Sequence, residues 1–389
     1  MFRNQKWFRA GLTTLLVLGI ACAAGHSVAR AAKPSPSLRY TMTLVPPLGS
    51  AVCRITGMNN DGDVVGVAAD SDGLGRGFYC LAPYEASVDL NSSRNRPAGW
   101  RITAAVHIND VGQISGNYRC IDADGTARDH AFVYDLLTDR FDSLPQPDGM
   151  PWSYAKGINN FGEITGELQN DGATVEQVFV WTPGSDPIPL DIDYNTSGVD
   201  INDDGQVIYL GTTDSGERHA FRYTPATYTA AARYEDLGVL GRLSDGTSKS
   251  IAQAINNAGQ VVGQSTSSAG WRAFRFTDGA GMVNLGTLDA RGVTQSEAVS
   301  INDLGQVVGW SAVQKSLGLV YRPMLYTDAT GRLNLWSLIT NPPAGMTEND
   351  MGLGADLNGV SIINPADGKT FGRICGTAKG LMYVLTPAP

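Results

Sequence analysis

The sequence predicts an all-β fold, a seven-bladed β-propeller built from four-stranded repeats of about 50 residues. Three observations predict it: a hairpin motif that recurs along the chain, an aromatic strand that follows most copies, and 46 Gly with 19 Pro among 389 residues. This many turn-forming residues suits short strands joined by tight turns rather than long helices. An open β-solenoid, whose repeats are usually shorter, is the competing architecture.

The hairpin motif has an apolar residue, then Asn-Asn or Asn-Asp, one variable residue, Gly, and a β-branched strand. Asn and Asp stabilise turns by bonding nearby backbone, and Gly takes the positive φ that such a turn requires. Six copies begin at Met58, Ile108, Ile158, Ile201, Ile255 and Ile301, at spacings of 50, 50, 43, 54 and 46 residues, and a degraded seventh runs from Val360 to Gly376. The structural repeat positions are therefore Asn59, Asn109, Asn159, Asn202, Asn256, Asn302, Gly62, Gly112, Gly162, Gly205, Gly259 and Gly305.

Two further strands complete each repeat. One carries alternating aromatic residues, as in His130-Ala131-Phe132-Val133-Tyr134 and His219-Ala220-Phe221-Arg222-Tyr223, which is typical of a half-buried strand. The other resembles Asp236-Leu237-Gly238. A stray copy of this last element, Tyr40 to Val45, precedes the first hairpin, so we expect it to close the ring beside the C-terminal strand Leu381 to Leu385.

Together these elements resemble the bacterial extracellular HAF-repeat family, since His130-Ala131-Phe132 and His219-Ala220-Phe221 match its His-Ala-Phe step in full. The resemblance covers nearly the whole chain after the N-terminal segment and implies export and a propeller-like repeat array, without a general catalytic role. Arg272 and Pro323 replace His in two later copies.

The N-terminal segment has the layout of a secretory signal peptide. Arg3, Lys6 and Arg9 precede an apolar run from Gly11 to Ala24 and the small-residue site at Ala29 to Ala31, so we expect residues 1–31 to be removed and 32–389 to form one propeller domain. An uncleaved anchor is disfavoured because the run is shorter than the roughly 20 residues that span a bilayer, and a lipoprotein signal at Cys22 remains the other alternative. The expected location is secreted or periplasmic, with no membrane span in the mature chain.

The net charge restricts the class of binding partner, and the cysteine content indicates possible disulfides. Removing residues 1–31 takes away four basic residues and no acid, which moves the formal charge from -9 to -13 and argues against a nucleic-acid partner. Cys53, Cys80, Cys120 and Cys375 remain as disulfide candidates, with Cys53 and Cys80 the first expected pair because they share a repeat. We expect a monomer that engages a protein or glycan.

One hairpin suggests a metal site. Asp200, Asn202 and Asp204 match the first three oxygen ligands of a calcium loop, but the twelfth position of that loop is Gly211 where a Glu is needed. Turn stabilisation by the same side chains is the favoured interpretation. We expect no cofactor, with calcium the one alternative.

The chain contains neither a GxSxG nor an HExxH motif, and only His107, His130 and His219 follow the signal segment. His130 and His219 occupy one equivalent repeat position, which favours packing between blades over catalysis. The catalytic residues are therefore unknown, and the expected function is a non-enzymatic binding or scaffold protein that uses the propeller loops or the central channel. An exported carbohydrate-active hydrolase or lyase and a calcium-dependent adhesin are the alternatives.

Overall fold

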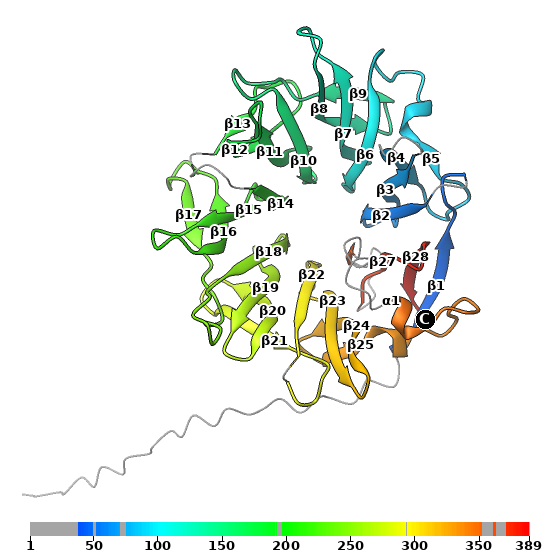
Figure 1. Ribbon diagram of the computed structural model, residues 1–389. Helices are drawn as coiled ribbons and strands as arrows, with labels where there is room; N and C mark the ends of the chain where they lie inside the picture. The colour runs from blue at the N-terminus through cyan, green and yellow to red at the C-terminus, as the bar shows by residue number, and fades with distance from the viewer. Residues whose placement is uncertain are drawn as a thin grey trace, which may run out of the picture. The chain divides into compact units, whose positions relative to one another are not determined.

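A computed structural model of the chain describes residues 38–49, 52–70, 75–190, 192, 197–292, 294–351, 361–362 and 371–388. The expected signal peptide, residues 1–31, lies outside this range, as does part of the seventh repeat. Seven four-stranded antiparallel sheets follow one another around a ring, which confirms the seven-bladed propeller (Figure 1). Within the described residues, no helix is long and apolar enough to cross a membrane.

Each of the first six blades uses four consecutive strands, and the first strand of each lies nearest the ring centre. Blades 1 and 2 comprise β2 (Cys53–Met58), β3 (Val64–Ala69), β4 (Gly75–Cys80), β5 (Val88–Asp89), β6 (Arg101–Ile108), β7 (Gln113–Ile121), β8 (Ala127–Asp135) and β9 (Arg140–Ser143). Blades 3 and 4 comprise β10 (Trp152–Ile158), β11 (Ile164–Gln169), β12 (Glu176–Trp181), β13 (Ile188–Pro189), β14 (Ser197–Ile201), β15 (Val207–Thr212), β16 (Arg218–Thr224) and β17 (Arg233–Asp236). Blades 5 and 6 comprise β18 (Ser250–Ile255), β19 (Val261–Ser267), β20 (Gly270–Thr277), β21 (Gly281–Gly286), β22 (Ser296–Ile301), β23 (Val307–Lys315), β24 (Gly318–Thr327) and β25 (Gly331–Asn334).

The seventh blade combines both ends of the described chain. Its strand order is β1-β28-β27-β26, comprising β1 (Tyr40–Val45), β28 (Leu381–Pro387), β27 (Ile374–Ala378) and β26 (Ser361–Ile362). Tyr40 lies opposite Pro387 and Val45 opposite Met382, so the early strand closes the ring as the sequence predicted. Short helical turns occur at η1 (Leu90–Ser92), η2 (Leu335–Leu338) and α1 (Glu348–Met351).

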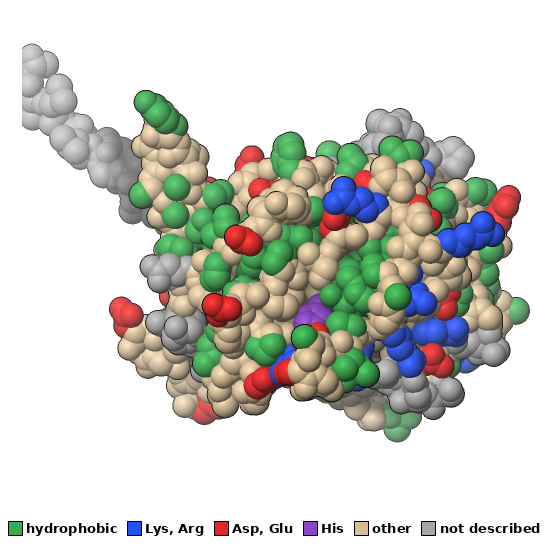
Figure 2. Space-filling view, turned by 90° about the horizontal axis from the view of Figure 1, so that it is seen from above, with side chains coloured by type: hydrophobic (Ala, Val, Ile, Leu, Met, Phe, Trp, Pro, Cys, Tyr) green, Lys and Arg blue, Asp and Glu red, His purple; other side chains and the backbone are tan. Residues whose placement is uncertain are grey.

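The core is divided among the blade interfaces. One apolar cluster joins Ile208 and Ala220 of blade 4 to Phe274 of blade 5, and comparable clusters lie along the ring. This follows from strand alternation: in β18, buried and partly exposed residues alternate, so every sheet turns one face to each neighbour. Seen edge-on, the outer surface mixes acidic, basic and apolar groups (Figure 2).

Strand register corrects one sequence alignment. Met324 pairs with Gly309 as Phe274 pairs with Gly263, so Met324 is the equivalent of Phe274. Arg322, and not Pro323, therefore stands at the repeat's His position, and both later substitutions place Arg there. The sequence alignment was one residue out because the shared aromatic is replaced by Met in this blade.

Register also separates the expected disulfide partners. Cys53 is paired through Ala68 to Arg76, which lies four residues before Cys80 on β4, so the two Cα atoms are about 16 Å apart at ordinary strand spacings. A disulfide needs Cα atoms within about 7 Å. Cys80 and Cys120 carry free thiols, so the expected pairing of Cys53 with Cys80 does not form.

Candidate functional site

The six hairpin turns converge on the ring centre, where the first Asn of five of them ties two blades together. The Asn202 side-chain oxygen accepts hydrogen bonds from the backbone amides of Asp204 and Gln206, while its amide donates to Gln206 Oε1 and to the Asn256 carbonyl of the next blade. Equivalent links between blades run from Asn59, Asn109, Asn159 and Asn256. The repeated Asn residues are buried structural ties.

The repeated Gly completes the same turn. In the six copies its φ lies between 69° and 92°, a region that other residues rarely adopt. In the blade 4 turn, its amide donates to the carbonyl of Asn202. Residues Gly62, Gly112, Gly162, Gly205, Gly259 and Gly305 thus have the backbone role that the sequence assigned to them.

The second residue of each turn forms a polar ring, here named the Asn/Asp collar, which alternates Asn and Asp around the channel mouth: Asn60, Asp110, Asn160, Asp203, Asn257 and Asp303. The backbone amide of Asn160 donates to Asp203 Oδ1 at 2.8 Å, and four further pairs repeat this contact. The Asn160 amide group donates to the carboxylates of both Asp110 and Asp203. Alternation therefore keeps carboxylates apart and gives each a neutral donor.

A pocket of about 260 Å³ opens within the collar, and its wall comes from the innermost strands. These strands bulge just before each motif, as between Ala252 and Ala254, so the register shift frees side chains such as Gln253 from the ladder. Thr56, His107 and Asp200 also line the pocket. The lining is mainly polar, and no two blades contribute the same set of side chains.

Asp200 is the acidic group of this wall. Its oxygens accept the backbone amides of Ile201 at 2.9 Å and Ile255 of the next blade at 3.2 Å. Burial raises the pKa of Asp200, and the nearby His107 partly offsets that rise. Gly157 lies between the strands of these two residues, and a Cβ there would press on the Asp200 carboxylate.

The side chains of the calcium candidates Asp200 and Asn202 bind different partners. Asp200 bonds into the channel wall, whereas Asn202 uses both ends of its amide within and between turns. Among the described residues, neither Asp200 nor Asp204 joins a group of three or more His, Cys, Asp or Glu ligand atoms close enough for one metal. Calcium binding here stays a prediction, and the turn role of Asn202 is observed.

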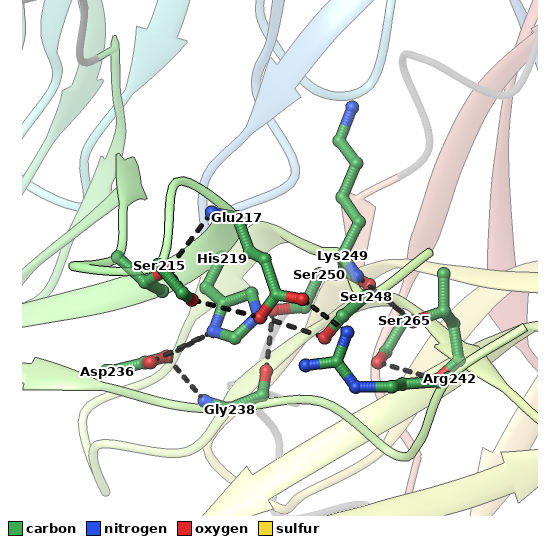
Figure 3. A network of polar contacts seen from close by, with 12 residues as sticks. Ser215, Glu217, His219, Asp236, Gly238, Arg242, Ser248, Lys249, Ser250 and Ser265 are labelled. Carbon is green, nitrogen blue, oxygen red and sulfur yellow. Dashed lines mark hydrogen bonds and ion pairs between the residues drawn. The ribbon is translucent and has the colours of Figure 1, made fainter. Parts of the chain in front are cut away.

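His219 lies outside the channel, in a polar network between blades 4 and 5 (Figure 3). Its Nδ1 contacts Asp236 at 2.9 Å and its Nε2 contacts Ser248 Oγ at 3.3 Å. These are the partners of a Ser-His-Asp relay, but Ser248 and His219 are each only 7 % exposed, which leaves little room for a substrate. The network instead joins the outer parts of two blades.

A neighbouring serine strengthens that junction. Ser250 Oγ accepts the Ala220 amide at 2.9 Å and donates to the Gly238 carbonyl at 2.7 Å. Ser153 and Ser296 receive the equivalent amides in two other interfaces. Sequence reasoning missed these serines, although each stands five residues before the motif's apolar residue. Asp236 belongs to the recurring element Asp236-Leu237-Gly238, whereas Ser248 had no such signal.

His130, the other repeat histidine, contacts Asp122 through Nε2 at 2.8 Å. Cys120 lies beside them, but burial and the adjacent Asp122 raise the pKa of its thiol to about 11. The thiol is therefore protonated at neutral pH and is not poised as a nucleophile.

Comparisons with solved structures find several similar chains, all of those reported below having a TM-score under 0.5. The β-propeller domain of the Trilobed protease from Pyrococcus furiosus matches at 10% identity and a TM-score of 0.47, covering 86% of this chain and 95% of that one. TolB from Acinetobacter baumannii matches at 14% identity and TM-score 0.43, covering 70% and 63%. Porphyromonas gingivalis dipeptidyl peptidase 4 matches at 11% identity and TM-score 0.44, covering 81% and 50%. The chain thus spans less than two thirds of the length of the last two.

No curated protein sequence matches the chain. A family described as "Protein of unknown function (DUF3466)" matches residues 189–373, which are 185 of the 389 residues, and the match runs from the end of blade 3 into blade 7. The chain is similar to this family over just under half its length.

Proposed function

We propose that this protein is a non-enzymatic binding module outside the cytoplasm, and that it holds a protein ligand by a basic side chain at the mouth of its central channel. The Asn/Asp collar carries the proposal. It surrounds a pocket with three carboxylates, and each accepts a hydrogen bond from at least one neutral side-chain amide.

Charge supports a basic ligand. The segment after residue 31 has a formal charge of -13, which favours encounter with cationic partners. Asp110 and Asp303 are exposed and Asp203 is half-buried. Hydrogen bonds from the neighbouring turns fix the orientation of these carboxylates, so a Lys or Arg can approach without disturbing the blade contacts. The signal-like N-terminus supports a location outside the cytoplasm.

The test compares two Asp-to-Asn variants of the same blade. Asp203 belongs to the collar, whereas Asp214 is exposed in the β15–β16 turn at the opposite end of the strands, so both variants lose one charge. Each purified protein is screened against arrays of basic peptides and of glycans, at low and high salt, and any bound ligand is analysed for cleavage.

The expected result is peptide capture that weakens with salt and falls about threefold in Asp203→Asn, equivalent to roughly 0.7 kcal/mol, with Asp214→Asn unchanged. Capture of glycans but not of basic peptides would show that the ligand is a glycan and not a basic protein segment. Cleavage of the ligand, or equal effects of both variants, would reject a non-enzymatic site at the collar.

A further inference from the structure

One hairpin far from the Asn/Asp collar brings together three different metal-ligand types. Cys120 is the second-last residue of β7, Asp122 begins the following turn, and His130 lies on β8. One ligand atom from each lies within 4.8 Å of the others, and this is the one such group among the residues that the structure describes. We propose that Cys120, Asp122 and His130 form a binding site for a zinc-class divalent cation.

Hairpin register explains why the three meet. Cys120 lies opposite Arg128, and Tyr118 lies opposite His130, so Cys120 and His130 are diagonal neighbours on one face of the strand pair. The turn is closed by the amide of Asp122 donating to Thr126 and by Gly125 with φ 81°. All three ligands therefore come from one short, rigid segment.

The contacts converge on a single oxygen. Asp122 Oδ1 receives the Cys120 thiol at 3.4 Å and contacts His130 Nε2 at 2.8 Å. A cation beside Oδ1 would replace these two hydrogen bonds with three ligand bonds. The Cys120 thiol would release its proton to solvent, since thiolate is the form that binds metal.

Neighbouring side chains hold Asp122 and His130 in place. Arg128 Nη1 binds the other oxygen, Asp122 Oδ2, at 3.0 Å, which leaves Oδ1 for the cation. The His130 ring, only 3 % exposed, lies 5.3 Å from the Tyr118 ring, and Tyr118 is itself stacked on Trp100 at 3.6 Å. The ligands are thus oriented before any metal arrives.

Charge around the hairpin also favours a cation. Arg128 pairs with the carboxylates of Asp122, Asp124 and Asp171, so one positive group faces three negative ones. The surplus of two negative charges rises to three when Cys120 is ionised. A divalent cation offsets most of it.

The donor set selects the metal class. One thiolate, one imidazole and one carboxylate suit Zn²⁺, which takes four ligands in a tetrahedron, whereas Ca²⁺ prefers oxygen ligands alone. Cys120 and Asp122 are both partly exposed, so water can supply the fourth ligand. Such a cation would fasten the end of the blade 2 hairpin.

Cobalt provides the test, because Co²⁺ bound to a thiolate gives a charge-transfer absorption band that carboxylate and imidazole ligands do not. The full protein is stripped with a chelator and titrated with Co²⁺, and bound metal is counted by elemental analysis. Cys120→Ser and His130→Gln remove ligands. His219→Gln is the matched control. His219 has the equivalent repeat position and also contacts an Asp, but among the described residues it does not belong to a group of three possible metal ligands.

The expected result is one cobalt per chain with the thiolate band in the parent and in His219→Gln, and loss of the band in Cys120→Ser. Zinc should raise the melting temperature of the parent and the control but not of Cys120→Ser, and His130→Gln should bind more weakly. Circular dichroism confirms that each variant is folded. A folded parent without the band, or a band that persists in Cys120→Ser, would overturn the proposal.

Discussion

The inner and outer parts of the blades are built on different principles. At the ring centre, the same Asn and Gly recur in blade after blade with nearly identical hydrogen bonds, as at Asn202 and Asn256. At the periphery three interfaces share the contact made by Ser250, but other polar contacts are particular to one interface, such as His219 with Asp236 and Arg128 with Asp171. Repetition therefore maintains the ring, and the individual outer clusters are where blades have diverged.

The largest expected effect comes from breaking one inner tie. Asn202→Ala removes four hydrogen bonds from a buried turn and leaves partners unpaired, so we expect a loss of about 3 kcal/mol in the free energy of unfolding, measured with urea. Asn170→Ala is the control, because Asn170 has the same turn role, accepting Thr174 and Val175 amides, on an outer turn. The control should lose less than about 1 kcal/mol. Equal losses would show that the inner ring has no special importance.

A smaller effect separates two serines of one outer interface. Ser250→Ala leaves the Ala220 amide and the Gly238 carbonyl without their bonds to a fully buried hydroxyl, so we expect a loss of about 2 kcal/mol. Ser248→Ala removes only a 3.3 Å contact with His219 and should cost under about 1 kcal/mol. Thermal and urea unfolding of both variants provide the measurement. If Ser248→Ala instead abolished a hydrolytic activity of the parent, its relay-like contacts would have to be interpreted as catalytic.

The alternation of the Asn/Asp collar gives a third, still smaller effect. Asn160→Asp places three carboxylates in a row with Asp110 and Asp203, where Asn160 now donates to both. We expect a loss of about 0.5–1 kcal/mol near neutral pH, since the groups are at least partly exposed and therefore screened. Like charges raise the pKa of the new carboxyl, so the loss should be absent in acid and appear as pH rises above about 4. High salt should reduce it, and a loss that ignores both salt and pH would contradict the electrostatic explanation.

How far the sequence predicts this molecule depends on the same division. The hairpin motif predicts Asn59 and Gly62 and their five counterparts, and Tyr40 to Val45 predicts the closing strand, because each depends on local turn chemistry or on a recurring pattern. The collar's Asn and Asp alternation is visible in the sequence, but its reason requires knowing that successive turns touch. Cys120, Asp122 and His130 lie within eleven residues, yet only the hairpin register shows that they face one another.

The outer network around His219 could not be predicted. Asp236 and Ser248 lie 17 and 29 residues from His219. The repeat pattern places His219 and Asp236 on successive strands but does not show that their side chains meet, and Ser248 belongs to no motif. The failed pairing of Cys53 with Cys80 has the same cause, because membership of one repeat does not fix strand register. Distances between side chains of different strands depend on tertiary packing that a repeat pattern does not encode.

The smallest expected effect concerns Asp200 in the channel wall, and it tests whether this carboxyl group adds to stability at neutral pH. Burial raises the pKa of Asp200 in the folded protein, so its contribution to stability is greatest below the unfolded pKa near 4 and is lost as pH rises through the folded pKa. Ala occupies the equivalent position in blade 5, as Ala254, so Asp200→Ala should be accommodated there. The difference in unfolding free energy, parent minus Asp200→Ala, should therefore fall as pH rises from below 4 toward neutral, measured by urea unfolding across that range. If the unfolding free energies of the parent and of Asp200→Ala changed with pH in parallel, the pKa of Asp200 would be the same in the folded and unfolded protein. A falling difference would mean that the blades tolerate a carboxylate whose charged form opposes folding, which is consistent with the proposed binding of a basic ligand at the channel.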